Sequence, residues 1–154
     1  MQPVGNITIA SAFNGPPNSG NGGYAAGILS RLFEAPHIVR ISAPIPLDTP
    51  LAITRQDQTL TAEHEGLPIL TARPGGVTLP PPAPPSMAAA LKAAETPTYF
   101  GAGGVSTCFV CGRNRKEGDG LHIHCGRLGD RLEAATVWTP HANFDDGTGH
   151  VRPE

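Results

Sequence analysis

The loop from Gly15 to Gly23 has the residue types and spacing of a segment that could hold an anionic or polarised group. Gly15 and Gly20 are separated by four residues, as in the loops that cradle nucleotide phosphates. However, Pro16 and Pro17 lack the N–H groups that would hold a phosphate. Asn and Gly also stand where such loops need Lys and Ser or Thr. The loop therefore does not indicate nucleotide binding. Its residues are also compatible with a simple turn before a capped helix, without any ligand.

A second candidate site combines the Cys-x-x-Cys pair Cys108 and Cys111 with His122, His124 and Cys125. These are the ligand types of a structural zinc site, with two ligands from a knuckle and the others from a strand. On a strand, the two histidines face one side and Cys125 faces the other, so the five side chains cannot converge. We therefore expect no bound metal and interpret Cys108 and Cys111 as small apolar groups. A zinc-stabilised interaction module is the alternative.

The charges of the chain are nearly balanced, with eleven Lys and Arg against thirteen Asp and Glu and a net charge of −2. Because they are scattered, they form no extended basic surface that could neutralise the phosphates of nucleic acid. The short basic cluster at residues 113–116 is interpreted as a solvated turn, with contact to the phosphates of a small ligand as the alternative. We expect no nucleic-acid partner.

The sequence carries no pattern that indicates export or membrane insertion. Residues 1–13 lack a basic segment followed by an apolar run, and no apolar stretch approaches the roughly 20 residues that span a bilayer. Three cysteines do not make the even set that is typical of small secreted disulfide scaffolds. We therefore expect a cytoplasmic protein with reduced thiols and no membrane partner.

The elements that must position the glycine-rich loop are a strand before it and a helix after it. Residues 6–13 carry β-branched residues in alternation, which predicts a strand. From Tyr24 to Ala35 the polar residues form one narrow stripe, which predicts a helix that is buried on most sides. Asn21 is the expected N-cap of this helix, and Pro36 is expected to end it.

The segment after this helix predicts an antiparallel meander. Strand-like alternation occurs in residues 37–45, 51–59, 60–65 and 67–74, separated by turn signals. We expect these strands to form a curved sheet wrapped around the helix, because a helix with so narrow a polar stripe must be covered on most sides. The expected fold class is α+β, with an antiparallel sheet around one central helix.

A proline-rich linker at residues 78–86 marks a boundary in the chain. It leads into an Ala-rich helix at residues 86–96, for which Ser86 is the expected cap. Further strand-like runs are expected at Gly120–Cys125 and Leu132–Trp138. We therefore expect three parts: a sheet-and-helix unit at 1–77, a linker with the Ala-rich helix at 78–105, and an incomplete second unit at 106–154.

Two stretches resemble a known family. The stretch from Phe13 to Pro74, with its loop GPPNSGNGGY, an apolar helix, VRISAPIPLDTPLAIT and a hairpin ending GLPILTARP, resembles the first repeat of double-hotdog acyl-CoA thioesterase-like proteins. The segment CFVCGRNRKEGDGLHI, followed by AATVWTPHANF and VRPE, is similar to the opening of the second repeat in one bacterial branch of that group. The resemblance implies a hotdog fold, in which a sheet wraps a central helix.

The resemblance also implies a substrate and a binding site. The ligand would be an acyl thioester such as acyl-CoA, bound at the helix entrance formed by Asn21, Gly22, Gly23 and Tyr24. Backbone N–H groups near Gly22 and Gly23 would stabilise the charge that develops on the thioester oxygen. A carboxylate would activate water or attack directly, and no cofactor is expected.

The catalytic residue is not identified by the sequence. In the family, the part resembling GHVRPE leads into a second central helix that carries the carboxylate, and here it would follow Glu154. We therefore expect a fragment of a longer protein or assembly with another copy as a homo-oligomer, and a non-catalytic acyl-CoA-binding or assembly module is an alternative to the enzyme. Glu34 lies too far from Gly22 to serve the same site. The remaining candidates of the first unit have no distinguishing feature: Asp48, Asp57, Glu63 and Glu65.

Overall fold

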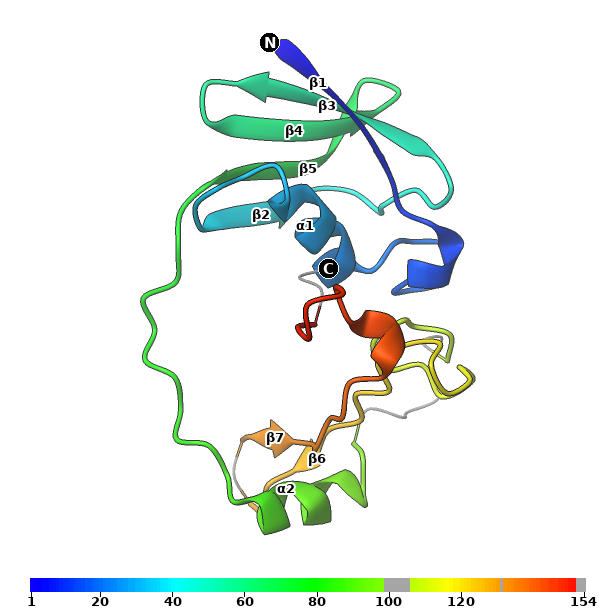
Figure 1. Ribbon diagram of the computed structural model, residues 1–154, viewed down its shortest axis with the longest axis vertical. Coiled ribbons are helices and arrows are strands. Elements are labelled where there is room, and N and C mark those ends of the chain that lie inside the picture. Colours follow the sequence, from blue (N-terminus) through cyan, green and yellow to red (C-terminus); the bar gives the residue numbers. More distant parts are fainter. Residues whose placement is uncertain (99–105, 131, 152–154) are drawn as a thin grey trace. The chain divides into compact units, whose positions relative to one another are not determined.

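The computed structural model describes residues 1–98, 106–130 and 132–151. Its contacts divide the chain between Thr78 and Leu79, so that Leu79–Val151, which includes nearly all of the proline-rich linker, forms a second unit. Figure 1 shows the helices and strands of both units. Among the described residues, no helix has the length and apolar character needed to cross a membrane.

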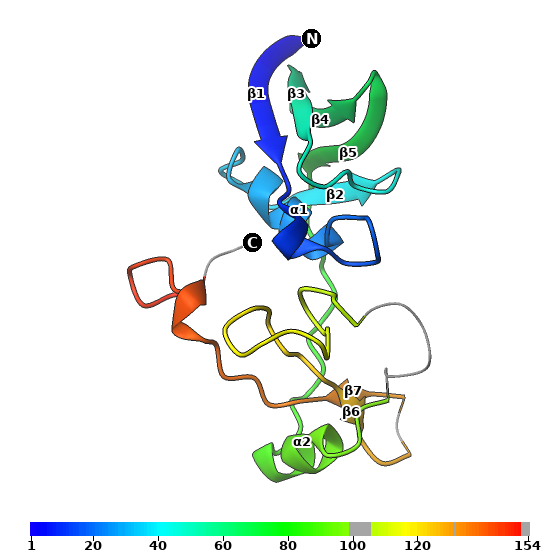
Figure 2. The same ribbon diagram turned by 90° about the vertical axis from the view of Figure 1, so that its right-hand side faces the viewer.

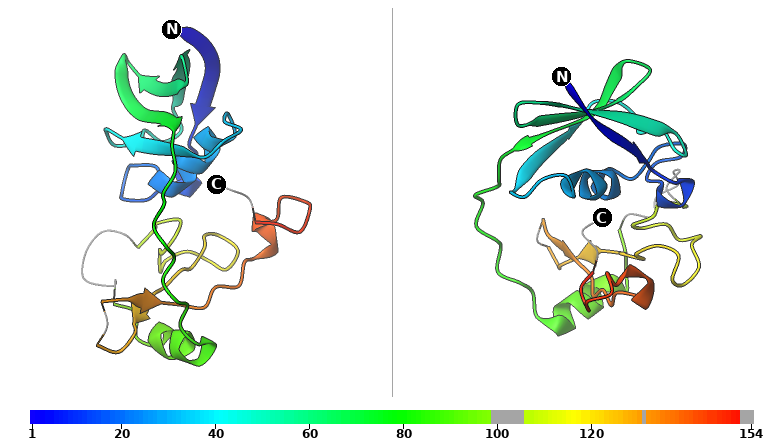
Figure 3. Two further views of the ribbon diagram at one scale, coloured as in Figure 1. Left: turned by 90° about the vertical axis from the view of Figure 1, so that its left-hand side faces the viewer. Right: turned by 45° about the horizontal axis from the view of Figure 1, so that its top comes forward.

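The first unit is a five-stranded antiparallel sheet with one helix on one of its faces (Figure 3). The strand order is β1-β3-β4-β5-β2, so β1 and β2 form the two edges. Helix α1 spans Gly22–Ser30 and lies along the sheet. The α+β class and the antiparallel sheet expected from the sequence are confirmed. The strands are β1 (Gln2–Thr8), β2 (His37–Ile41), β3 (Pro50–Gln56), β4 (Thr59–His64) and β5 (Leu67–Pro74).

The core lies between α1 and the facing side of the sheet. Alternation along the central strands places every second residue toward the helix, as strand geometry requires. On the helix, Ala25 and Leu29 are fully buried against this face. Burial of one such Leu contributes roughly 1.5–3 kcal/mol. The buried strand residues are Leu51, Ile53, Leu60, Ala62, Leu70 and Ala72.

A bulge between β4 and β5 adds Ile69 to this core. Ala62 is opposite Leu70 and Glu63 is opposite Pro68, so Ile69 is the extra residue on its strand. Such a residue interrupts the alternation of faces. As a result, the consecutive residues Ile69 and Leu70 are both buried, which simple alternation does not predict.

The first strand begins earlier than its sequence pattern predicts. Residues 6–13 were expected to be a strand, but β1 ends at Thr8 and a short 3₁₀ turn, η1, spans Ser11–Phe13. A register shift between Pro3 and Gly5 lets the strand continue through the glycine. Figure 2 shows the resulting curvature of β1. The chain therefore reaches the glycine-rich loop through a tight turn instead of an extended strand.

The central helix ends earlier than expected, at Ser30 instead of near Pro36. The amides of Arg31, Leu32 and Phe33 bond to carbonyls three residues back, at 3.4, 3.2 and 3.0 Å. Such bonds tighten and close a helix end. The N-cap prediction at Asn21 is confirmed, because its side chain accepts from the amide of Tyr24.

The second unit contains helix α2 (Met87–Ala94) and little other regular structure. Ser86 caps α2 through the amide of Ala89, as predicted. Two short strands, β6 (Gly126–Arg127) and β7 (Ala134–Ala135), pair beside it, and a 3₁₀ turn, η2, spans Ala142–Phe144.

Of the two strands expected in the second unit, the one at residues 120–125 is wrong, and the one at 132–138 is confirmed only at Ala134–Ala135. Residues 120–125 are irregular because His122 has a left-handed φ angle of 52°, which a side-chain-bearing residue in a strand does not adopt. In the second run only Ala134 and Ala135 pair as a strand. The buried Gly126 marks the close approach of β6 to α2, since a Cβ atom there would overlap the carbonyl of Ala93.

Candidate functional site

The glycine-rich loop closes on itself before helix α1 begins. The amide of Gly15 donates to the carbonyl of Ser19 at 2.9 Å, and the amide of Ser19 donates to the carbonyl of Pro16 at 3.2 Å. Asn18 adopts a left-handed conformation with φ of 61°, which Asn tolerates better than most residues. The prolines and this Asn therefore shape a turn whose ends are held together by backbone bonds.

The loop is fixed to the segment that follows β2. Gly20 donates its amide to the carbonyl of Ile45 at 2.9 Å, and the hydroxyl of Ser19 accepts from the amide of Ile45 at 3.0 Å. A Cβ atom on Gly20 would lie 2.9 Å from a methyl of Ile45 and 3.0 Å from one of Ile9. Only glycine allows this approach, so the position of the helix start depends on Gly20 and Ser19.

Asn21 is a helix cap whose side-chain oxygen and backbone groups are already bonded. Its side-chain oxygen accepts from the amide of Tyr24 at 3.0 Å, and its own amide donates to the carbonyl of Phe13 at 2.8 Å. Its carbonyl accepts from Ala25 at 2.9 Å. Asn21 therefore orients the first turn of α1 and leaves ligand contacts to its neighbours.

Gly22 and Gly23 present the amides that the cap does not use. Within the described part of the chain, their N–H groups donate to no protein acceptor. Gly23 is exposed, and a Cβ atom there would meet only the side-chain oxygen of Asn21, at 3.3 Å. These amides also lie at the positive end of the helix dipole. The first turn of α1 can thus hold an anionic or polarised oxygen.

An open groove of about 730 Å³ lies beside this helix start. Gly22 is part of its wall, and most of the remaining surface is apolar. The sequence placed Ile41 on an alternating strand but gave no signal that it would stand over Gly22, and it also missed the anchoring role of Ser19. The other lining residues come from the loop, from the end of β2 and from the segment after it: Pro16, Pro17, Asn18, Ser19, Gly20, Ile41, Ser42, Ala43, Pro44 and Ile45.

Tyr24 packs against the chain instead of lining the groove. Its ring stacks on Phe13, with centroids 3.8 Å apart and planes 6° from parallel. This contact ties the first turn of α1 to η1. The four predicted residues therefore lie in one turn with different roles. Gly22 lines the groove and Gly23 is exposed, whereas Asn21 caps α1 and the ring of Tyr24 packs on Phe13.

The candidate carboxylates of the first unit lie outside this groove. Asp48 accepts from the amide of Ser11 at 2.9 Å, which fixes the η1 turn. Asp57 and Glu65 occupy turns with φ of 53° and 50°, and Glu34 follows the end of α1. None of them is held beside the amides of Gly22 and Gly23.

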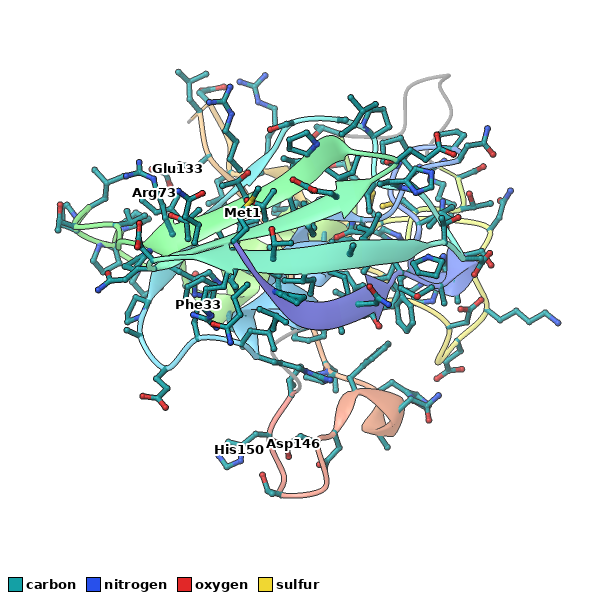
Figure 4. The ribbon with its side chains drawn as sticks, turned by 90° about the horizontal axis from the view of Figure 1, so that it is seen from above. Met1, Phe33, Arg73, Glu133, Asp146 and His150 are labelled. Carbon is teal, nitrogen blue, oxygen red and sulfur yellow. The ribbon has the colours of Figure 1, made fainter. Side chains whose placement is uncertain are left out.

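A polar turn near the C-terminal end of the described chain is closed by its own bonds. Figure 4 shows Asp146 and His150 next to each other. The amide of Asp146 donates to the carbonyl of His150 at 2.9 Å, and the hydroxyl of Thr148 donates to Asp146 Oδ1 at 2.7 Å. The side chain and backbone of Thr148 lower the pKa of Asp146 by hydrogen bonding to its charged form. These contacts account for the turn without a ligand.

The cysteine and histidine cluster differs from its sequence interpretation. His122 and His124 do not lie on a strand, so the alternation argument against convergence does not apply. Nevertheless, no group of three His, Cys, Asp or Glu side chains among the described residues is placed to hold a metal ion. The ring of His122 bonds to the carbonyl of Lys116 at 2.9 Å.

Two groups of this cluster have shifted pKa values. Burial first, and then the neighbouring thiol of Cys108, raises the pKa of Cys111. Burial, followed by the nearby ring of His122, lowers the pKa of His124, and a backbone hydrogen bond with Cys111 partly opposes this shift. Both shifts favour the neutral form of the side chain.

The described residues thus define an α+β protein with an open groove at the start of a helix that buries one side, at Ala25, Gly27 and Leu29, and not most of its sides as the sequence predicted. Comparisons with protein-family models, curated proteins and solved structures find no match to this chain.

Proposed function

We propose that the chain binds an acyl thioester such as acyl-CoA at the first turn of α1. The observation that carries this proposal is the pair of amides on Gly22 and Gly23, which donate to no protein acceptor within the described residues. The thioester carbonyl accepts from these amides, and the acyl chain occupies the apolar groove beside Gly22.

The architecture of the first unit is compatible with this proposal. One helix lies against a curved antiparallel sheet with the order β1-β3-β4-β5-β2, in keeping with the hotdog resemblance of the sequence. We propose that residues 1–77 are a hotdog unit and that residues 106–154 begin a second one, joined by the linker and α2 at 78–105. A cytoplasmic location and assembly with a second copy belong to the same proposal.

Binding and turnover make different chemical demands on this site. Amides directed at a developing oxyanion are each worth about 10²–10³ in rate where they are part of a working active site. Hydrolysis also needs a base near the attacking water, which contributes about 10²–10⁴. No carboxylate of the described residues lines the groove. We therefore propose binding with slow or absent hydrolysis by this chain.

The test combines calorimetry with a thiol-release assay on the full chain. A non-hydrolysable acyl-CoA analogue should bind with one site per first unit, while coenzyme A without an acyl group should bind more weakly because the groove stays empty. The acyl-CoA itself should release free thiol slowly. Equal affinity for coenzyme A and the analogue, or no binding of either, would refute the site. Rapid thiol release would leave the site standing and refute only the absence of a base.

A further inference from the structure

A tight turn in the second unit brings Cys108 and Cys111 together. The amide of Gly112 donates to the carbonyl of Cys108 at 2.7 Å, which closes one helix-like turn over the Cys-x-x-Cys pair. A Cβ atom on Gly112 would lie 2.5 Å from the carbonyl oxygen of Cys108 and 2.7 Å from that of Ser106. Only glycine fits at the end of this turn, so the close spacing of the two cysteines depends on it.

The turn is supported from outside by a second segment of the chain. Leu121 donates its amide to the carbonyl of Phe109 at 2.8 Å, and Ile123 donates to the carbonyl of Val110 at 2.9 Å. Phe109 is buried and contacts Phe144 edge to face. The backbone of the two residues between the cysteines is therefore held by residues 121–123, which limits how far apart the two cysteine Cα atoms can move.

The geometry of such a turn suits a disulfide. The Cα atoms at the ends of a four-residue turn lie within about 7 Å of each other. Disulfides join Cα atoms about 4.4–6.8 Å apart. Cys108 is 6% exposed, while Cys111 is partly exposed and interacts with the Cys108 thiol. One thiol is thus accessible for attack, and the other is positioned behind it.

We propose that Cys108 and Cys111 are a redox-active dithiol that closes to an intramolecular disulfide by exchange with a small-molecule disulfide such as glutathione disulfide. The Cys111 thiolate attacks one sulfur of the small disulfide, which forms a mixed disulfide and releases one thiolate. Cys108 then loses its proton, attacks the Cys111 sulfur and releases the second thiolate. The protein gives up two electrons and two protons, and the small disulfide becomes two thiols.

This dithiol is independent of the proposed acyl-thioester site, because every group that builds it belongs to the second unit. The raised pKa of Cys111 makes the first attack slow at neutral pH and faster as the pH rises, since the thiolate is the nucleophile.

The experiment equilibrates the full chain in buffers of rising glutathione disulfide to glutathione ratio, followed by acid quench, alkylation and peptide mass analysis. Cys108 and Cys111 should lose alkylation together with a loss of two hydrogens, while Cys125 should form no bond with either of them. Cys125→Ser is the matched control and should leave the midpoint unchanged. Alkylation of all three cysteines in the most oxidising buffer, or a bond between Cys111 and Cys125, would overturn the proposal.

Two variants distinguish a redox-active dithiol from other reactions of Cys108 and Cys111. Cys108→Ser should leave Cys111 as a stable mixed disulfide with glutathione, and absence of that adduct contradicts the attack order. Gly112→Ala should open the turn and lower the exchange equilibrium constant at least tenfold, equal to about 30 mV. If Gly112→Ala does not fold, the adduct on Cys108→Ser still tests the proposed dithiol. One equivalent of zinc protecting both thiols in the purified chain would assign the pair to a metal and refute the dithiol.

Discussion

The backbone of Gly22 and the side chain of Ile41 lie so close that a Cβ atom on Gly22 would stand 2.6 Å from Cδ1 of Ile41. The start of α1 is therefore in contact with the end of β2, at one end of the apolar groove. The atom that blocks a larger residue is the far end of a flexible, half-exposed side chain. Substitutions at these two positions should consequently be coupled.

The coupling can be measured with a double-mutant cycle. Gly22→Ala should reduce the free energy of unfolding by less than about 1 kcal/mol, because Cδ1 of Ile41 must move aside but belongs to a flexible, half-exposed side chain. Ile41→Val removes Cδ1 and should restore that loss in the double variant. Urea unfolding measures all four chains. Gly76→Ala is the control, since nothing lies within 4 Å of a Cβ atom there. Additive effects at the two positions would contradict the contact.

The side chain of Asn21 should stabilise the first unit by about as much as one helix-capping hydrogen bond contributes. Asn21→Ala removes the acceptor 3.0 Å from the Tyr24 amide and should lower the free energy of unfolding by about 1 kcal/mol. Asn21→Ser should retain most of it, because Ser is also a good cap. Ser86→Ala provides a matched cap loss at α2 in the other unit. If Asn21→Ala and Asn21→Ser were equally unstable, the side chain would have another role.

Much of the secondary structure of the first unit can be predicted from its sequence, because the local sequence signals and the burial of the side chains indicate the same elements there. The cap at Asn21, the turn at Glu65 and Gly66 and the alternation in β3 and β4 all predict what the structure contains. The bulge that buries Ile69 beside Leu70 cannot be predicted from the local sequence, because it arises where β5 pairs with β4. The early end of α1 likewise depends on its bonds three residues back and not on Pro36 alone.

The sequence located the candidate site but not its surroundings. Asn21 to Tyr24 are adjacent in the chain, so their grouping needs no tertiary information. The contact of Gly22 with Ile41 and the anchoring of Ser19 to Ile45 join separate segments, and no local pattern encodes them. In the second unit, the alternation around His122 indicated a strand, but the left-handed backbone at that residue rules one out.

His124 should make the stability of the second unit depend on pH. Burial and the ring of His122 lower its pKa, with Arg113 as a further cationic neighbour, so the folded state favours the neutral ring. The unfolded state takes up the proton first, so this stability is fully present above about pH 6.5 and is lost as the pH falls from there through the lowered pKa of His124 in the folded state. The fluorescence of Trp138, the only tryptophan, reports the unfolding. His124→Gln should flatten this loss, and His64→Gln should not. An equal acid loss in His124→Gln would contradict the assignment.

The two edge strands should support self-association. β1 and β2 have no neighbour on their outer sides among the described residues, and Ile38 on β2 is 41% exposed. A sheet edge whose backbone groups are unpaired and whose side chains include exposed apolar residues favours pairing with another chain. We expect a dimer in sedimentation equilibrium at micromolar concentration, and Ile38→Lys should shift it toward monomer. A monomeric unmodified chain would contradict this expectation.

The most direct test of the proposed acyl-thioester site is the response of individual amides to the ligand. In a ¹H–¹⁵N spectrum of the full chain, titration with a non-hydrolysable acyl-CoA analogue should shift the resonances of Gly22 and Gly23 most strongly, because their N–H groups form new hydrogen bonds. Gly76 should not move. The same shifts should be much smaller with coenzyme A alone. Saturable binding that leaves Gly22 and Gly23 unshifted would place the ligand elsewhere and contradict the central claim.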